Sequence, residues 1–259
     1  MKYIIITGTS RGIGEAIARE LLVQGNTLIC ASRTMNENLV ETASELGIPM
    51  YYHECDLSKP NSARAFIKNA ISIISTESTE SIALVNNAGI LEPIGPSGTL
   101  NPKLMEQHLR TNLLGPAILI NSFIRLTAKM AIQKVILSIS SGASEYPYHG
   151  WSMYCSAKAG IDMLTRTVAL EQETARNPVK LLAVKPGIVE TAMQERIRNT
   201  KTRQFREKEK FVKLHTDGML STPKSVAELI ASALFLPGIP QGGILTINHL
   251  KDILNKSGV

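Results

Sequence analysis

The sequence predicts an α/β fold, a doubly wound parallel sheet of about seven strands covered by helices on both faces. Short apolar runs rich in β-branched residues alternate with longer segments whose apolar residues recur at helical spacing. Strands that alternate with helices of this length pair in parallel, because the chain must cross over between them. With 259 residues and 44% hydrophobic content the chain can bury one large core, so we expect a single domain over residues 1–259.

The alternation is regular through the first half of the chain. Residues 3–7 form an apolar, β-branched run, typical of a buried parallel strand. Residues 13–23 repeat apolar side chains at helical spacing, and the helix is expected to end near Gly25. The next expected elements are a strand at 28–31, a helix at 37–46, a strand at 50–55, a helix at 61–74 and a strand at 82–85.

The second half continues the pattern and adds a basic segment. We expect helices at 102–109 and 113–130, a strand at 135–139, a helix at 152–175, a strand at 180–184, a helix at 224–235 and a last strand at 244–247. Residues 195–213 carry eight basic and three acidic side chains, a local net charge of +5. Alternating Glu and Lys are typical of a solvated helical face. The alternative is a mobile, substrate-side flap at about 190–220 that attracts an anionic ligand.

Composition excludes several classes of protein. Three widely spaced cysteines fit neither a disulfide framework nor a zinc site, and five scattered histidines suggest no metal. The net charge of +6 is mild for this length, so we expect no nucleic-acid partner. No cationic leader and no apolar segment of membrane-spanning length occur, which predicts a cytoplasmic protein without a membrane partner.

The first strand leads into a glycine motif. Gly8, Gly12 and Gly14 follow the strand and open the next helix. Glycines let the backbone approach a diphosphate closely, and a helix N-terminus offers free N–H groups and a positive dipole end. The motif therefore predicts a nucleotide-phosphate site.

A tyrosine and a lysine stand four residues apart on a predicted helix. Tyr154 and Lys158 therefore share one helical face, although a snorkelling lysine on an amphipathic helix gives the same spacing. Ser141 follows the preceding strand, and Pro186-Gly187-x-x-x-Thr191 follows the next one. Because carboxyl ends of parallel strands meet at one edge of a sheet, these groups are expected to converge there.

These motifs, together with Asn86-Asn87-Ala88-Gly89, resemble the short-chain dehydrogenase/reductase family in their order and over nearly the whole chain. The resemblance implies a Rossmann-like, NADP-binding reductase that forms a homodimer or homotetramer. Residues 150–158, 161–164 and 190–194 are similar to those of sepiapterin reductases and bacterial benzil reductases.

The resemblance implies a role for each catalytic residue. Tyr154 gives a proton to the substrate carbonyl, and Lys158 favours the phenolate that is left. Ser141 hydrogen-bonds the carbonyl oxygen, with neighbouring Ser140 as the competing candidate. Asn112 matches the fourth member of the catalytic set, and it could also be a helix N-cap.

The cofactor-binding residues are implied by the same motifs. They are Gly8, Ser10, Arg11, Gly12, Ile13, Gly14, Arg33, Asp56, Leu57, Asn86, Ala88, Gly89, Tyr154, Lys158, Pro186, Gly187, Val189 and Thr191. The second strand ends in Ala31-Ser32-Arg33, without the acid that would repel a 2′-phosphate. Arg11 and Arg33 suit forked phosphate contacts, which favours NADP(H), although either could be an ordinary surface residue.

The substrate residues implied by the resemblance are Ser141, Trp151, Tyr154, Gly187 and Met193. Sepiapterin reductases carry an aspartate in the last strand. Residues 243–248 here contain no acidic side chain, and the next one along the chain is Asp252. We therefore expect an NADPH-dependent carbonyl reductase for a small diketone or a pterin side-chain ketone. Alternatives are a 3-oxoacyl-carrier-protein reductase and a non-catalytic NADP-binding regulator; the complete set of Ser141, Tyr154 and Lys158 argues against the regulator.

Overall fold

The computed structural model describes residues 1–75 and 77–257 and confirms the predicted α/β architecture. Within these residues, seven parallel strands form one sheet in the order β3-β2-β1-β4-β5-β6-β7. The strands are β1 (Lys2–Thr7), β2 (Asn26–Ser32), β3 (Met50–Glu54), β4 (Ser81–Asn86), β5 (Gln133–Ile139), β6 (Lys180–Lys185) and β7 (Gly243–Thr246). The strand order reverses between β1 and β4, and ligands bind at such a switch point in open α/β sheets.

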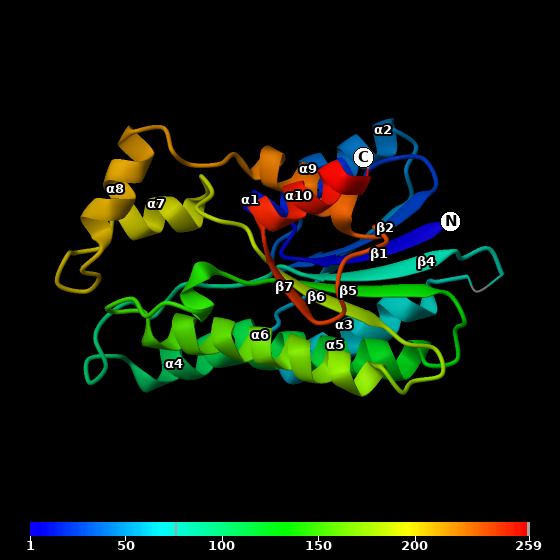
Figure 1. Cartoon of the computed structure of the whole chain (residues 1–259), viewed down its shortest axis with the longest axis horizontal. Helices are drawn as coiled ribbons and strands as arrows, with labels where there is room; N and C mark the ends of the chain where they lie inside the picture. Colours follow the sequence, from blue (N-terminus) through cyan, green and yellow to red (C-terminus); the bar gives the residue numbers. More distant parts are fainter. Residues whose placement is uncertain (76, 258–259) are drawn as a thin grey trace.

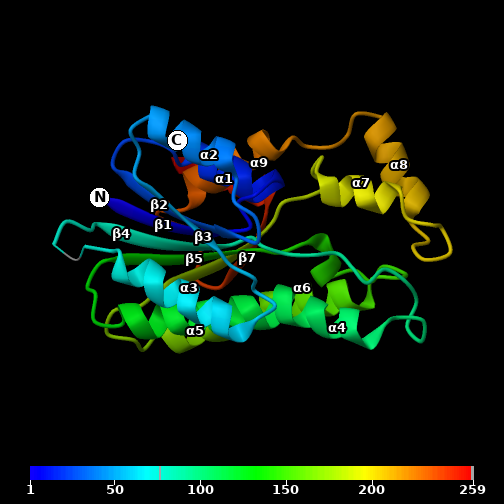
Figure 2. The ribbon, with the colours of Figure 1, turned by 180° about the vertical axis from the view of Figure 1, so that it is seen from behind.

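Helices cover both faces of the sheet (Figures 1 and 2). One layer contains α1 (Gly12–Glu20), α2 (Glu37–Glu45), α9 (Pro223–Ala233) and α10 (Ile247–Ser257). The other contains α3 (Pro60–Ser72), α4 (Pro102–Leu109), α5 (Gly115–Thr127) and α6 (Ser152–Gln172). Alternate residues of β1 face opposite layers: Ile4 and Ile6 pack into one apolar cluster, and Tyr3 and Ile5 into the other.

Two expected elements differ in the structure, and one helix was not expected. The helix expected at 113–130 is preceded by a π-helical segment, η1 (Arg110–Leu114), which joins α4 to α5 without a break. The expected last strand stops at Thr246, where the Thr246 hydroxyl accepts a hydrogen bond from the His249 backbone N–H. Residues from Ile247 onward form α10, which the sequence analysis missed, and Leu250 and Leu254 bury one face of it.

The basic segment folds into two helices, α7 (Ala192–Arg198) and α8 (Lys208–Thr216). We call residues 190–220 the α7–α8 lobe, which projects from one end of the molecule (Figure 1). Its two ends are paired, because Glu190 N–H donates to Ser221 O and Ser221 N–H donates to Ile188 O. The Glu190 carboxylate also binds Arg198 of α7 and His215 of α8, at 2.9 and 2.8 Å.

Among residues 1–75 and 77–257, no helix has both the length and the apolar composition needed to cross a bilayer.

Candidate active site

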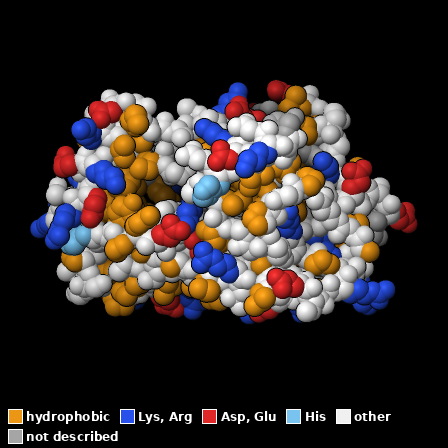
Figure 3. All heavy atoms as spheres, viewed as in Figure 1, with side chains coloured by type: hydrophobic (Ala, Val, Ile, Leu, Met, Phe, Trp, Pro, Cys, Tyr) orange, Lys and Arg blue, Asp and Glu red, His pale blue; other side chains and the backbone are white. Residues whose placement is uncertain are grey.

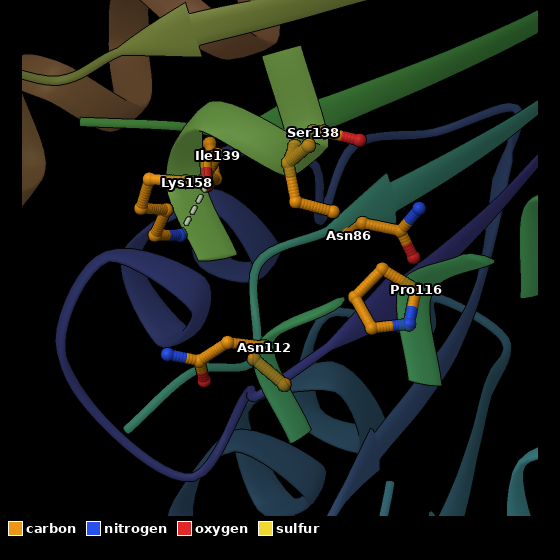
Figure 4. Close-up of a pocket in the computed structure, with 8 residues that line it drawn as sticks. Asn86, Asn112, Pro116, Ser138, Ile139 and Lys158 are labelled. Carbon is orange, nitrogen blue, oxygen red and sulfur yellow. Dashed lines mark hydrogen bonds between the residues drawn. The ribbon is translucent and has the colours of Figure 1, made fainter. Parts of the chain in front are cut away.

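Tyr154 and Lys158 lie one turn apart on the buried face of α6. The Tyr154 side chain is 9% exposed, and Lys158 Nζ lies 5.7 Å from the centre of its ring. Lys158 Nζ also donates to the Ile139 carbonyl at the end of β5, at 2.6 Å (Figure 4). The helical spacing thus places phenol and ammonium side by side, as the sequence predicts.

Burial moves both groups away from their ordinary proton affinities. It raises the pKa of Tyr154 to about 12, and the nearby Ser141 hydroxyl opposes this shift. Burial lowers the pKa of Lys158 to about 8, and the Asp162 carboxylate opposes this shift. At neutral pH the phenol therefore keeps its proton. The pKa of Lys158 lies close enough to neutral pH for the charge of the lysine to depend on pH.

Ser141 and Ser140 are placed differently, although they are neighbours in sequence. Ser141 caps the short 3-10 helix η2 (Gly142–Ser144), and its oxygen accepts a hydrogen bond from Ala143 N–H at 3.1 Å. Ser140 is buried, and its backbone N–H donates to Val184 O on β6. The Ser141 hydroxyl, and not that of Ser140, lowers the pKa of Tyr154 through a side-chain hydrogen bond. The structure therefore favours Ser141 as the residue that contacts the carbonyl.

Asn112 is buried inside η1 and does not cap a helix, so the N-cap alternative is wrong. Its side chain exchanges two hydrogen bonds with the Ile90 backbone, at 2.8 and 2.7 Å, and donates to His108 Nε2 at 2.9 Å. Pro116 has no backbone N–H. The backbone carbonyl of Asn112 therefore lacks the donor that a regular α-helix would supply four residues later. The wider π turn occurs where this hydrogen bond is missing.

The glycine loop packs against the segment that follows β4. Asn87 Nδ2 donates to the Thr7 and Gly8 carbonyls at 2.9 and 3.1 Å. Gly12 has a φ of +65°, and a Cβ there would meet only Thr191 within 4 Å. The Arg11 side chain does not cap α1, so the first N–H groups of the helix remain available. The loop, the free N–H groups and the open side of Gly12 fit a dinucleotide diphosphate.

The end of β2 presents the two predicted arginines. Both Arg11 and Arg33 are exposed, and in the described part of the chain neither has an ion-pair partner. Beside Arg33, the Ser32 and Tyr52 hydroxyls lie 2.6 Å apart, and Thr9 Oγ1 donates to Tyr52 Oη at 3.1 Å. Arg33 directly follows Ser32, and Arg11 lies two residues after Thr9, so the segments that carry the hydroxyl cluster also carry the two exposed arginines, which fits a phosphorylated ribose.

Other predicted cofactor residues lie along the same edge of the sheet. Asp56 Oδ1 accepts from the backbone and hydroxyl of Ser58, so its carboxylate holds the turn before α3. Asn86 is buried at the end of β4, and its amide has no hydrogen-bond partner among the described residues. It lines a small cavity with Asn112, Ser138 and Lys158 (Figure 4). The remaining residues are Ser10 and Ile13 at the start of α1, buried Leu57 after β3, Ala88 and Gly89 after Asn86, and Pro186, Gly187, Val189 and Thr191 between β6 and α7.

An aromatic cluster, which the α7–α8 lobe completes, packs against Tyr154 and contains the predicted substrate residues Trp151 and Met193. Trp151 is 4% exposed, stacks on Phe205 at 4.3 Å and meets Tyr154 edge-on at 5.5 Å. Phe211 and Met193 of the lobe also pack on this cluster. Apolar side chains gather around a hollow beside the lobe (Figure 3). Trp151 therefore belongs to an apolar core next to Tyr154, where it can also wall a substrate pocket.

This arrangement occurs in a known protein family. The family model described as short chain dehydrogenase matches residues 2–202. The chain belongs to the short-chain dehydrogenase family. It is accordingly an oxidoreductase that acts on carbonyl and hydroxyl groups, and the family predicted from the motifs is confirmed.

Individual members of the short-chain dehydrogenase family match over most of their length. Benzil reductase ((S)-benzoin forming) of Bacillus cereus is 38% identical over 249 residues, 96% of this chain and 100% of that protein. Sepiapterin reductase of Xenopus laevis is 29% identical over 202 residues, 74% of each chain. The crystal structure of a Saccharomyces cerevisiae short chain dehydrogenase/reductase superposes with a TM-score of 0.83 at 25% identity, covering 98% of this chain and 99% of that one.

The sequence analysis missed several residues that shape the site. Asn87 belongs to a motif that was recognised, but its bracing of the glycine loop depends on a contact between β1 and β4. His108 links Asn112 to the Glu92 carbonyl, which lies 2.7 Å from His108 Nδ1. Lys185 and Asp162 form a buried ion pair beside Lys158. Apart from the four-residue step from His108 to Asn112, these pairings join residues far apart in the sequence, which a single sequence does not reveal.

Gly14→Ala is expected to destabilise the protein by about 1–3 kcal/mol, because a Cβ there would overlap the Asn87 amide and the Gly8 carbonyl. Urea unfolding measures the change. Gly142→Ala is the matched control, since among the described residues no atom beyond its two chain neighbours lies within 4 Å of its Cβ position, and it should change stability by less than about 0.5 kcal/mol. Equal stabilities for the two variants would show that the loop can move aside.

Proposed function

We propose that the protein is an NADPH-dependent carbonyl reductase for small hydrophobic 1,2-diketones. The main support is that Tyr154, Lys158 and Ser141 meet at the carboxyl edge of the sheet, beside a glycine loop with free helical N–H groups. The likeness to benzil reductase supports the substrate class. Binding of NADP(H) in preference to NAD(H) is supported by Arg11 and Arg33 and by the absence of an acid at the end of β2.

Each catalytic side chain then has a defined task. The bound cofactor supplies a hydride to the carbonyl carbon. The protonated Tyr154 phenol gives its proton to the carbonyl oxygen, and the Lys158 ammonium stabilises the phenolate that is left. The Ser141 hydroxyl donates to the same oxygen as negative charge develops on it. Asn112 anchors the η1 segment to the Ile90 backbone on the other side of this edge.

The aromatic cluster favours a flat, apolar substrate over a pterin. Trp151, Phe205 and Phe211 pack on one another next to Tyr154 and are nearly fully buried, so they make the surroundings of the phenol apolar. The last strand supplies no carboxylate, and Asp252 lies exposed on α10. A pterin would thus lack a charge-assisted hydrogen bond worth about 1.5–3 kcal/mol.

We therefore expect kcat/KM to be about tenfold or more higher for benzil than for sepiapterin. The measurement is NADPH oxidation with benzil, sepiapterin and a 3-oxoacyl thioester, repeated with NADH as cofactor. A tenfold preference for sepiapterin would contradict the proposed substrate class. Turnover of the thioester alone would favour a 3-oxoacyl-carrier-protein reductase, and NADPH binding without any turnover would favour a regulator.

Assembly and location stay predictions. We expect a homodimer or homotetramer in the cytoplasm, and light scattering of the purified protein measures the mass of the assembly.

A further inference from the structure

A buried ion cluster lies behind the proposed catalytic groups. Lys185, the last residue of β6, is 5% exposed, and its Nζ lies 2.5 Å from Glu145 Oε1 and 3.7 Å from Asp162 Oδ2. Asp162 is also 5% exposed, and its Oδ1 has no hydrogen-bond partner in the described part of the chain. Glu145 is different, because its side chain is 53% exposed. A buried carboxylate needs cations close to it, so Asp162 depends on its charged neighbours.

The cluster connects three segments that carry the site. Asp162 lies one helical turn after Lys158, so the two buried side chains share a face of α6. Glu145 follows Ser141 by four residues and ends η2. Lys185 directly precedes Pro186 and Gly187 of the predicted cofactor-binding set. A change in any of the three charges therefore alters the electrostatic potential next to the proposed proton donor.

Few charged or titratable groups face Lys158. Tyr154 lies on its own helix, and the Ile139 carbonyl faces it from β5. His108 faces it from α4, and burial lowers the pKa of this imidazole, which keeps it neutral. Among the described residues, Asp162 is the carboxylate whose charge raises the pKa of Lys158 against the effect of burial.

Lys185 has its own set of neighbours. Asp162 reaches it from α6 and Glu145 from η2, and Lys185 lowers the pKa of Glu145. Arg166, one turn beyond Asp162 on α6, lowers the pKa of Glu145 further. Two carboxylates therefore share one buried ammonium, and the shorter contact is to the exposed one.

We propose that Asp162 is a positioning residue whose negative charge keeps the Lys158 ammonium charged. Lys185, which pairs with the same carboxylate, weakens this effect of Asp162 on Lys158. The inference rests on the proposed function, because it concerns the cation beside the proton donor. Asp162 held by Lys185 has less effect on Lys158. Glu145 draws Lys185 away from Asp162. A half-exposed carboxylate thereby affects the charge of the buried Lys158 through Lys185 and Asp162.

The direct test is the titration of Lys158 by NMR in the cofactor-free protein, with ¹³C-labelled lysine and Lys158→Met to assign the signal. Asp162→Asn removes the favourable charge and should lower the pKa of Lys158 by about one unit. Lys185→Met frees Asp162 and should raise it. Glu145→Gln lets Lys185 pair with Asp162 and should lower it by less. Asp252→Asn, on the exposed face of α10, is the matched control and should leave it unchanged.

The second readout is the pH profile of kcat/KM for carbonyl reduction. Reduction requires charged Lys158, so kcat/KM falls as the pH rises through its pKa. The fall should move to lower pH in Asp162→Asn and to higher pH in Lys185→Met. A variant that merely disturbs packing would lower the rate by the same factor at every pH.

The outcomes separate this inference from the proposed function. An unchanged Lys158 titration in Asp162→Asn overturns the inference even if the parent reduces diketones. Shifts in the same direction for Asp162→Asn and Lys185→Met overturn the competing role of Lys185. If Lys185→Met does not fold, Glu145→Gln, changed at a half-exposed side chain, tests that role alone: a lowered pKa supports it and a raised or unchanged pKa overturns it. The predicted NMR shifts in a parent without reductase activity would sink the proposed function and leave the charge cluster intact.

Discussion

Tyr154→Phe is expected to lower kcat for carbonyl reduction by about 10²- to 10⁴-fold while NADPH affinity stays within a few-fold of the parent. The substitution removes the proton donor but keeps the ring, which packs edge-on against Trp151 and His108 at 5.5 and 6.1 Å. Because the apolar contacts survive, the loss should appear in the chemical step and not in folding. NADPH absorbance gives kcat, and quenching of protein fluorescence gives the affinity.

Tyr146→Phe is the matched control for this experiment. Tyr146 lies in the loop between η2 and α6, eight residues before Tyr154, but its side chain is 65% exposed and forms no part of the proposed site. It should retain parental turnover. Turnover of Tyr154→Phe within a few-fold of the parent would exclude Tyr154 as the proton donor.

Arg33→Asp is expected to weaken NADPH binding by about 10- to 100-fold and NADH binding by less than about threefold. One lost charge-assisted contact costs about 1.5–3 kcal/mol, and the new carboxylate also repels the 2′-phosphate. Arg33 is exposed at the end of β2 and has no ion-pair partner in the described chain, so no internal contact is broken. Titration calorimetry with both cofactors measures the two dissociation constants.

Arg64→Asp serves as the control, since it makes the same charge change on the exposed side of α3. It should alter the NADPH and NADH affinities equally and slightly. If Arg33→Asp left the ratio of the two affinities unchanged, Arg33 would not contact the 2′-phosphate, and Arg11 would be the next residue to test.

The sequence predicted those parts of the site that depend on local spacing. The Gly8–Gly14 motif, the four-residue step from Tyr154 to Lys158 and the buried strands all follow from rules that act within a few residues. The doubly wound arrangement followed as well, because crossovers between parallel strands have one hand, whereas the order of the strands came from the structure. The fold could therefore be predicted almost completely.

The parts that the sequence did not predict depend on tertiary contacts or on short, weak patterns. Lys185 reads as the polar end of a strand until α6 and η2 bring two carboxylates to it. Helix α10 is anchored by two leucines and by the Thr246 cap, a pattern too short to separate from a strand end. The break between helices expected near Asn112 was wrong, because the π-helical segment η1 joins α4 to α5 just before Pro116.

The paired ends of the α7–α8 lobe have a consequence for how the protein can be altered. The lobe leaves and rejoins the body at Val189 and Ser221, which bridge each other, so its path begins and ends at nearly one point. The entropic cost of closing such a loop changes little with its length. Phe205 and Phe211 sit inside this interval, whereas Tyr154 and Lys158 lie outside it. Changes around Phe205 and Phe211 can thus alter the aromatic cluster while Tyr154 and Lys158 keep their places on α6.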